Sequence, residues 1–269
     1  THVYWWVESG YRLSGDDLER SALRFENQTY PTNRRFFGSE WSPGIDGDPR
    51  IYIYLGNIPG VGGYFLGPDE YPAQSNQHEM IYINLDNAAP GSDYFDGLLA
   101  HEYQHMIHWA MDRDEDTWVS EGLSELAGQL NGYDVGSSPD RFSEAPDSQL
   151  NTWPDLVASD PHYGASYLFV AYFYERYGEE AIRMLVAEPA NGIRGFEAVL
   201  ARIDPESSFD KLFADWLIAN YLQGAKRPAG RYGYANLELR HFAHAAEHSH
   251  YPVQEQATVR QYAADYVLL

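Results

Sequence analysis

Two neighbouring stretches of the chain decide its fold: HEYQHMIHW at residues 101–109 and DTWVSEGLSELAG at residues 116–128. The first contains His101, Glu102 and His105 in the order H-E-x-x-H. Residues four apart share one face of a helix, so the two histidines can hold one metal ion. Glu102 lies beside them and can reach water bound to that ion. The pattern therefore predicts metal-assisted hydrolysis.

The residues around this motif predict a helix with one apolar face. Ser92 or Asp93 is a suitable N-cap. Apolar side chains then recur at helical spacing, at Phe95, Leu98, Leu99, Met106 and Trp109. The H-E-x-x-H motif thus falls on a helix, as its chemistry requires.

Catalytic zinc takes three protein ligands, so two histidines leave one ligand to be found. His108 lies on the same helix, but the longer motif H-E-x-x-H-x-x-G-x-x-H fails because His108 replaces Gly and Met111 replaces His. The acidic residues 112–116 resemble a solvated loop at the helix end. Glu121 is the better candidate, because an antiparallel second helix would return it over the histidines.

Glu121 and Glu125 lie four residues apart on this second helix, for which Ser120 is the predicted N-cap. Its apolar face is formed by Leu123, Leu126, Ala127 and Leu130. Glu125 would lie one turn deeper than Glu121 and accept the free ring N–H of a ligand histidine. An ordinary exposed carboxylate at position 125 is the alternative.

The arrangement of H-E-x-x-H with a glutamate on the next helix resembles the gluzincin metallopeptidases. Three segments, HEYQHMIHW, WVSEGLSELAG and HYGASYLFVAYFYERYG (residues 162–178), look most like the secreted bacterial hyicolysin group. A looser similarity extends to the immune inhibitor A peptidases. The resemblance covers residues 80–180 with specific motifs.

This resemblance implies zinc on His101, His105 and Glu121, Glu102 as general base, and a peptide substrate. The thermolysin-type N-E-x-x-x-D appears here as S-E-G-L-S-E, so Glu125 replaces the aspartate. Gluzincins also supply a Tyr or His beyond the glutamate helix to stabilise the oxyanion. By chain order, the candidates are Tyr163, then Tyr167, then His162, and aromatic core packing is the alternative for each.

The implied fold class is α+β, a zincin-type metallopeptidase. Strands are predicted at residues 2–7, 50–55 and 79–85. We expect a catalytic domain over residues 1–224, in which 1–111 form a mixed-sheet lobe with the motif helix and 112–224 a helical lobe with Glu121. Residues 225–269 read as an extension ending in a strand over 258–269 and leading into a further β-rich domain. The cleft is expected between the two lobes.

Strand 80–85 is predicted to be an edge strand that binds substrate main chain, through Ile81, Tyr82, Ile83 and Asn84. Asp46 and Asp48 lie in a glycine turn and offer oxygen ligands that suit calcium, although turn chemistry also explains them. A histidine cluster over residues 241–250 fits no single zinc template and is interpreted as surface.

Composition narrows the possible partners and the location. The chain of 269 residues has a formal net charge of −22 and no cysteine. Disulfides and thiol chemistry are therefore excluded, and secretion by a bacterium is compatible with this composition. Nucleic acid and membrane insertion are not expected, because the chain has no basic cluster and no apolar stretch of about 20 residues. We expect a secreted monomer.

Two other functions fit part of the pattern. A zinc aminopeptidase shares the metal motif, but the usual G-x-M-E-N segment before H-E-x-x-H is missing. A non-catalytic binding module on a peptidase scaffold is the second alternative, and the intact His101, Glu102, His105 and Glu121 argue against it. The sequence thus favours a secreted zinc-dependent endopeptidase.

Overall fold

The computed structural model describes residues 1–71, 76–155, 158–222 and 231–269, which form two compact units of an α+β protein. Unit 1 comprises residues 1–114 and 123–135, and unit 2 comprises residues 115–122 and 136–269. The predicted domain boundary at 224/225 lies outside the described residues. In the described part of the chain, no helix is long and apolar enough to cross a membrane.

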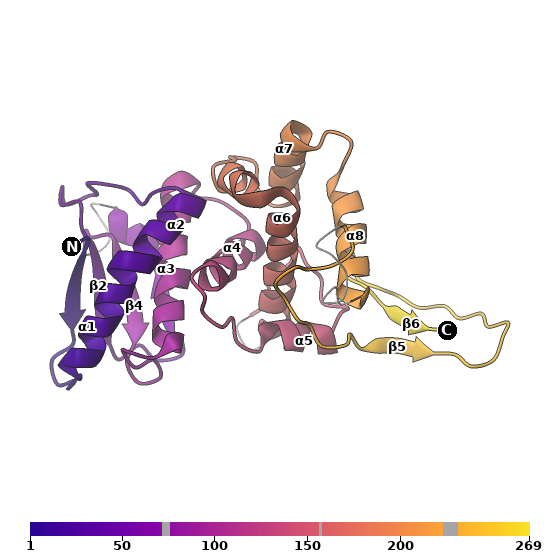
Figure 1. The fold of residues 1–269 in the computed structure, drawn as a ribbon, viewed down its shortest axis with the longest axis horizontal. Coiled ribbons are helices and arrows are strands. Elements are labelled where there is room, and N and C mark those ends of the chain that lie inside the picture. The colour runs from indigo at the N-terminus through magenta and orange to yellow at the C-terminus, as the bar shows by residue number, and fades with distance from the viewer. Residues whose placement is uncertain (72–75, 156–157, 223–230) are drawn as a thin grey trace. The chain divides into compact units, whose positions relative to one another are not determined.

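Unit 1 is built on a four-stranded mixed sheet (Figure 1). Its strands are β1 (Val3–Val7), β2 (Ile51–Gly56), β3 (Gly63–Phe65) and β4 (Met80–Asn84). The strand order is β1-β2-β4-β3, with β1, β2 and β4 parallel and β3 antiparallel to β4. Parallel neighbours need crossover connections. The connection from β1 to β2 is helical, whereas the connection from β2 to β4 contains β3 and a short 3-10 helix.

Alternation along the strands separates the two faces of the sheet. Ile53, Leu55, Ile81 and Ile83 are fully buried on one face. The other face carries an aromatic row, defined by Trp6, Tyr54, Tyr82 and Tyr64 at one register position across all four strands. The sheet therefore has an aliphatic core face and a partly exposed aromatic face.

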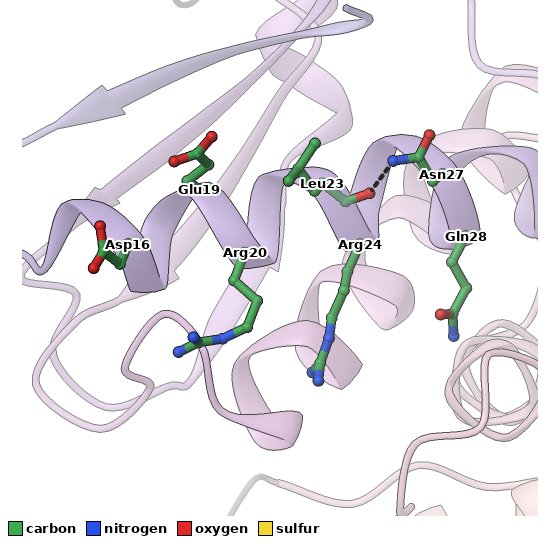
Figure 2. A pocket seen from close by; sticks show the side chains of 7 residues that line it. All are labelled: Asp16, Glu19, Arg20, Leu23, Arg24, Asn27 and Gln28. Atoms are coloured by element: carbon green, nitrogen blue, oxygen red, sulfur yellow. Dashed lines mark hydrogen bonds between the residues drawn. The ribbon is translucent and has the colours of Figure 1, made fainter.

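The helices of unit 1 begin with α1 (Gly15–Arg24), a π-helical turn η1 (Phe25–Thr29) and α2 (Tyr30–Phe37). They continue with η2 (Gly67–Glu70) and α3 (Asp93–Met111). Ser92 caps α3 by accepting the N–H of Phe95, as the sequence predicts. A shallow pocket along α1 and η1 is lined by Leu23 and by polar side chains from Asp16 to Gln28, and no predicted site residue lines it (Figure 2).

Unit 2 is helical apart from two short strands. Its helices are α5 (Ser138–Glu144), α6 (Asp160–Val186), α7 (Ile193–Ile203) and α8 (Phe209–Leu222), and its strands are β5 (His244–Glu247) and β6 (Tyr266–Leu268). Aromatic rings fill the core. Trp118 stacks on Phe196 with ring centroids 5.6 Å apart, and Phe169 packs edge-on against Trp216 at 5.4 Å.

Helix α4 (Thr117–Leu130) carries residues of both units, because the division passes between Gly122 and Leu123. It begins three residues before the predicted cap Ser120, so that prediction is wrong. The carbonyl of Asp116 instead accepts the N–H groups of Val119 and Ser120, and Asp116 is the residue that precedes the helix.

Four further features go beyond the sequence analysis or differ from it. The glycine-rich segment 60–65 contains β3, and the polar segment after α4 contains α5. The predicted closing strand over 258–269 is limited to Tyr266–Leu268. Helix α6 is kinked at Gly178, which has φ 80°, and the helix resumes after it.

Candidate metal centre

Helix α3 presents His101 and His105 to one point in space. Their Nε2 atoms lie 3.1 Å apart, and their ring centroids 4.8 Å apart. Two nitrogens bound to one tetrahedral zinc ion lie roughly 3.3 Å apart, given zinc–nitrogen bonds of about 2.0–2.1 Å. The four-residue spacing thus gives the geometry of a chelating pair, as the sequence predicts.

Glu121, in the second turn of α4, completes a three-residue group with these histidines. One ligand atom from each of His101, His105 and Glu121 lies within 4.8 Å of the others. Among the described residues, no other group of three or more His, Asp or Glu side chains meets this criterion. Two imidazoles and one carboxylate are a donor set of catalytic zinc sites, so these residues fit that metal.

Glu125 lies behind His101, one turn along α4 from Glu121. Its Oε1 atom is 3.4 Å from His101 Nδ1, the ring nitrogen on the opposite side from the ligand atom. A carboxylate in this place orients the ring and increases its basicity. The structure therefore brings Glu125 to the position that the sequence predicts.

Behind His105 is a contact that the sequence analysis did not identify. Ser124 Oγ lies 3.1 Å from His105 Nδ1, and Ser124 donates a hydrogen bond of 2.5 Å to Gln104 Oε1. Both Ser124 and Gln104 are fully buried. The available signal was the spacing on α4, because positions 121, 124 and 125 share one helix face.

Glu102, the predicted base, lies on α3 next to the first ligand and is 5% exposed. His108, the discarded ligand candidate, is 2% exposed and does not join the metal group. Burial, together with the nearby His105, lowers the pKa of His108 to about 3. His108 is thus a neutral interior side chain.

The three oxyanion candidates lie at the start of α6. Tyr163 is half-buried, with its ring edge-on to Trp153 at 4.8 Å, whereas Tyr167 is 1% exposed. Burial lowers the pKa of His162, whose ring also approaches Trp153. Tyr163 is therefore the more accessible of the two tyrosines.

Strand β4 is not the edge strand that the sequence predicts. It is paired with β2 on one side and β3 on the other, so its main chain has no open side. Ile81 and Ile83 face the core, and Tyr82 belongs to the aromatic row. Asn84 donates to the carbonyls of Ile58 and Val61 and so holds the loop before β3.

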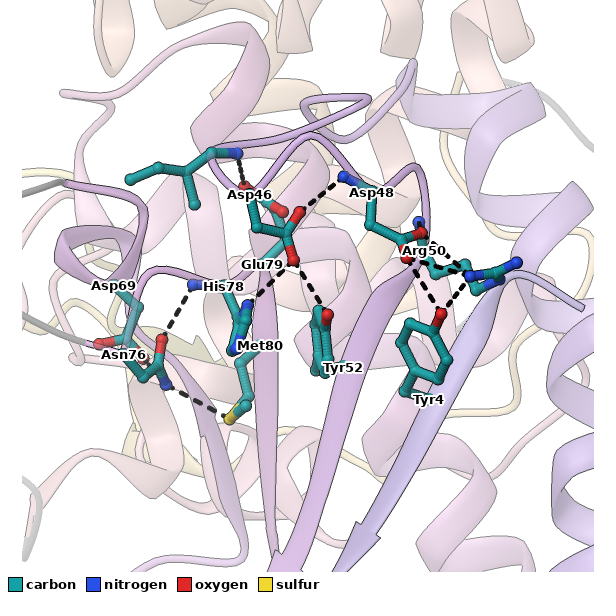
Figure 3. Close-up of polar contacts among 11 residues, drawn as sticks. Tyr4, Asp46, Asp48, Arg50, Tyr52, Asp69, Asn76, His78, Glu79 and Met80 are labelled. Atoms are coloured by element: carbon teal, nitrogen blue, oxygen red, sulfur yellow. Dashed lines mark hydrogen bonds and ion pairs between the residues drawn. The ribbon is translucent and has the colours of Figure 1, made fainter.

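Asp46 and Asp48, the calcium candidates, accept hydrogen bonds from protein groups (Figure 3). Asp46 accepts from the Asp48 N–H and the Tyr52 hydroxyl and contacts His78, while Asp48 accepts from Tyr4. Burial alone would raise the pKa of Asp46, but these hydrogen bonds outweigh it and lower that pKa. Turn chemistry accounts for both residues, and calcium is not supported.

The histidines of residues 241–250 form no metal group within the described chain. His244 lies 3.4 Å from Glu247, and His248 lies 3.5 Å from Glu255. Such partly exposed pairs agree with the interpretation of this segment as surface.

No protein-family model matches this chain, and no curated protein matches its sequence. Its fold is similar to solved structures of an M1 zinc metallopeptidase from Deinococcus radiodurans. A mutant of that peptidase is 13% identical to this chain, with a TM-score of 0.50. The match covers 80% of this chain and 47% of the peptidase chain. The same values hold for a mutant bound to a Tyr-Ser-Ala substrate. The chain thus shares an α+β fold with these structures and spans about half their length.

Proposed function

We propose that this chain is a zinc-dependent peptidase that cleaves within peptide chains. The observation that carries the proposal is the convergence of His101, His105 and Glu121 within 4.8 Å, with Glu102 next to the first ligand. The similarity in fold to zinc metallopeptidases supports the same activity, and a related structure is bound to a tripeptide substrate.

His101, His105 and Glu121 would hold the metal, and Glu102 would handle the protons. Bound zinc would supply a Lewis acid that polarises the scissile carbonyl and lowers the pKa of water. Glu102 takes one proton from the attacking water as its oxygen bonds to the carbonyl carbon. The carbon–nitrogen bond then breaks, and Glu102 gives that proton to the leaving amine.

The substrate main chain is proposed to bind to strand β3. Asn84 N donates to Gly62 O over 2.8 Å, so the pairs 62/84 and 64/82 are the hydrogen-bonded ones. The N–H and C=O groups of Gly63 and Phe65 therefore point away from β4, where an extended peptide can pair with them. The beginning of β3 also lies against Leu98, three residues before His101.

Tyr163 is proposed to donate a hydrogen bond to the developing oxyanion, because it is the accessible tyrosine at the start of α6. An aminopeptidase remains the second candidate, because the similar structures are M1 peptidases. The missing G-x-M-E-N segment favours the endopeptidase. From the cysteine-free composition, we further propose that a bacterium secretes this protein. The three motifs at residues 101–109, 118–128 and 162–178 support a relationship to the hyicolysin group, and we propose that the protein is a monomer.

The test uses one peptide sequence with either a free or an acetylated N-terminus. An endopeptidase cleaves both forms at an internal bond, whereas an aminopeptidase releases the first residue of the free form only. Zinc content is measured on the same samples by elemental analysis, with about one zinc per chain expected.

Two variants separate the roles of metal and base. His105→Ala should lose both zinc and activity. Glu102→Gln keeps the side-chain shape, so it should retain zinc while cleavage falls at least about a hundredfold. Full activity in Glu102→Gln, or equal zinc content in His105→Ala, would contradict the assignment.

A further inference from the structure

We propose that Ser124 and Gln104 form a neutral hydrogen-bond relay that fixes the ring of His105 for metal binding. This inference rests on the zinc-binding part of the proposed function and does not depend on peptide cleavage. It concerns residues that do not touch the metal or substrate, and both therefore act as positioning residues.

The geometry fixes which nitrogen of His105 faces the metal. The Nε2 atom is directed toward His101 Nε2, 3.1 Å away, and the Nδ1 atom is directed toward Ser124 Oγ, also 3.1 Å away. A neutral imidazole carries its hydrogen on one nitrogen and a lone pair on the other. Metal binding through Nε2 therefore requires the hydrogen on Nδ1.

The direction of the relay follows from the donors and acceptors that are available. Gln104 Oε1 can only accept, so it takes the single hydroxyl hydrogen of Ser124 in their 2.5 Å contact. The oxygen of Ser124 then offers only lone pairs to His105. It can accept the Nδ1 hydrogen and cannot donate one. The relay therefore favours the tautomer in which Nε2 is free to bind metal.

Burial keeps solvent from changing the direction of this relay. Ser124 and Gln104 are both fully buried, so water cannot replace a lost partner. The opposite amide orientation would let Gln104 donate to Ser124, and the Ser124 hydrogen would then be available for donation to Nδ1. That arrangement would place the histidine hydrogen on the metal side. The orientation of one buried amide thus biases His105 toward one tautomer.

One face of α4 thus supplies three residues to the site. Glu121 supplies a ligand atom, Ser124 holds His105, and Glu125 contacts His101. The two histidines are held differently, because one partner is a neutral buried hydroxyl and the other is a carboxylate. The sequence predicts only the carboxylate partner of His101. The relay adds a neutral partner for His105.

Zinc affinity of the full chain, measured by competition with a chromophoric chelator, tests the relay. Ser124→Ala should bind zinc about 10- to 100-fold more weakly, the usual cost of losing such a partner. Ser124→Thr keeps the hydroxyl and should restore affinity to within a few-fold. Ser21→Ala is the matched control, because Ser21 is a fully buried serine that accepts the Gly91 N–H in the same unit.

Two further measurements test the direction. In the zinc-loaded protein, the Nδ1 hydrogen of His105 should give a slowly exchanging NMR signal that Ser124→Ala loses. Gln104→Glu retains an acceptor and should keep zinc affinity near the parent value, whereas Gln104→Leu should lower it. Melting temperatures identify any variant that fails to fold.

Equal zinc affinity in folded Ser124→Ala and the parent chain would overturn the relay, and so would an equal loss in Ser21→Ala. Loss of affinity in Gln104→Glu with none in Gln104→Leu would reverse the assigned direction. If the parent chain binds no zinc, the proposed function itself fails. If it binds zinc but cleaves no peptide, the activity fails while the relay can still be measured.

Discussion

At the scale of single residues, the site consists of polar side chains whose roles depend on their degree of burial. Glu102 is nearly buried beside a ligand, Tyr163 is half-buried, and Tyr167 is enclosed. A group that must meet substrate needs access, whereas an enclosed hydroxyl contributes to packing. This difference separates two tyrosines that occupy similar positions in the sequence.

Replacing each tyrosine with phenylalanine tests that separation. Tyr163→Phe should lower kcat by roughly ten- to a thousandfold, because a hydrogen bond to the transition state is lost. Its melting temperature and zinc content should stay near the parent values. Tyr167→Phe should instead change stability with little effect on kcat. If Tyr167→Phe has a low kcat and Tyr163→Phe a normal one, the oxyanion donor is Tyr167, one helical turn along α6.

At the scale of elements, helical spacing predicted the parts of the site that lie on α3 and on the face of α4. His101, His105 and Glu121 followed from periods of four residues and from a returning second helix. Gln104 could not be predicted in the same way, because its contact with Ser124 joins two helices and depends on their packing. Strand β3 was missed because three residues in a glycine-rich segment show no alternation.

Close packing between α4 and α6 gives a prediction at this scale. A Cβ atom at Gly122 would lie 2.7 Å from Ser166 O and 2.8 Å from Val170 Cγ2. Gly122→Ala should therefore destabilise the protein by about 1–3 kcal/mol, the usual cost of overpacking. Because Glu121 is the preceding residue, zinc affinity should fall as well.

Gly128→Ala is the control on the same helix. A Cβ atom at Gly128 meets nothing within 4 Å, so this change should be neutral or stabilising by up to about 1 kcal/mol. Thermal unfolding and chelator competition give both quantities. Equal effects at the two positions would show that contact with α6 does not control the position of the ligand.

At the scale of the whole molecule, burial of acidic groups links stability to pH. The carboxylate of Glu70 is 3% exposed, and burial, with Glu79 nearby, raises its pKa from 4.5 to about 7. The folded protein thus binds this proton more tightly than the unfolded chain does. The resulting stability is complete below about pH 4.5 and is lost as the pH rises to about 7.

Glu70→Gln should remove this dependence, because the amide has no charge to bury. Melting temperatures of parent and variant should be similar at pH 5. At pH 8 the variant should be more stable by an amount on the order of 1–3 kcal/mol. A parallel pH dependence in both proteins would show that Glu70 does not titrate in this range.

The aromatic row on the sheet of unit 1 has a spectroscopic consequence. Trp6 at one end of the row is 44% exposed, and its ring lies 5.1 Å from that of Tyr52. Light absorbed by such a tyrosine passes to the indole by energy transfer, and a wet indole fluoresces at longer wavelength than the enclosed Trp118 and Trp216. Because Trp41 is also exposed, at 41%, the Trp6 signal is best read in a Trp41→Phe variant. There, iodide should quench the red component first, and any molecule that covers the aromatic face should shield it. The chain therefore carries its own fluorescent reporter of what happens on that surface.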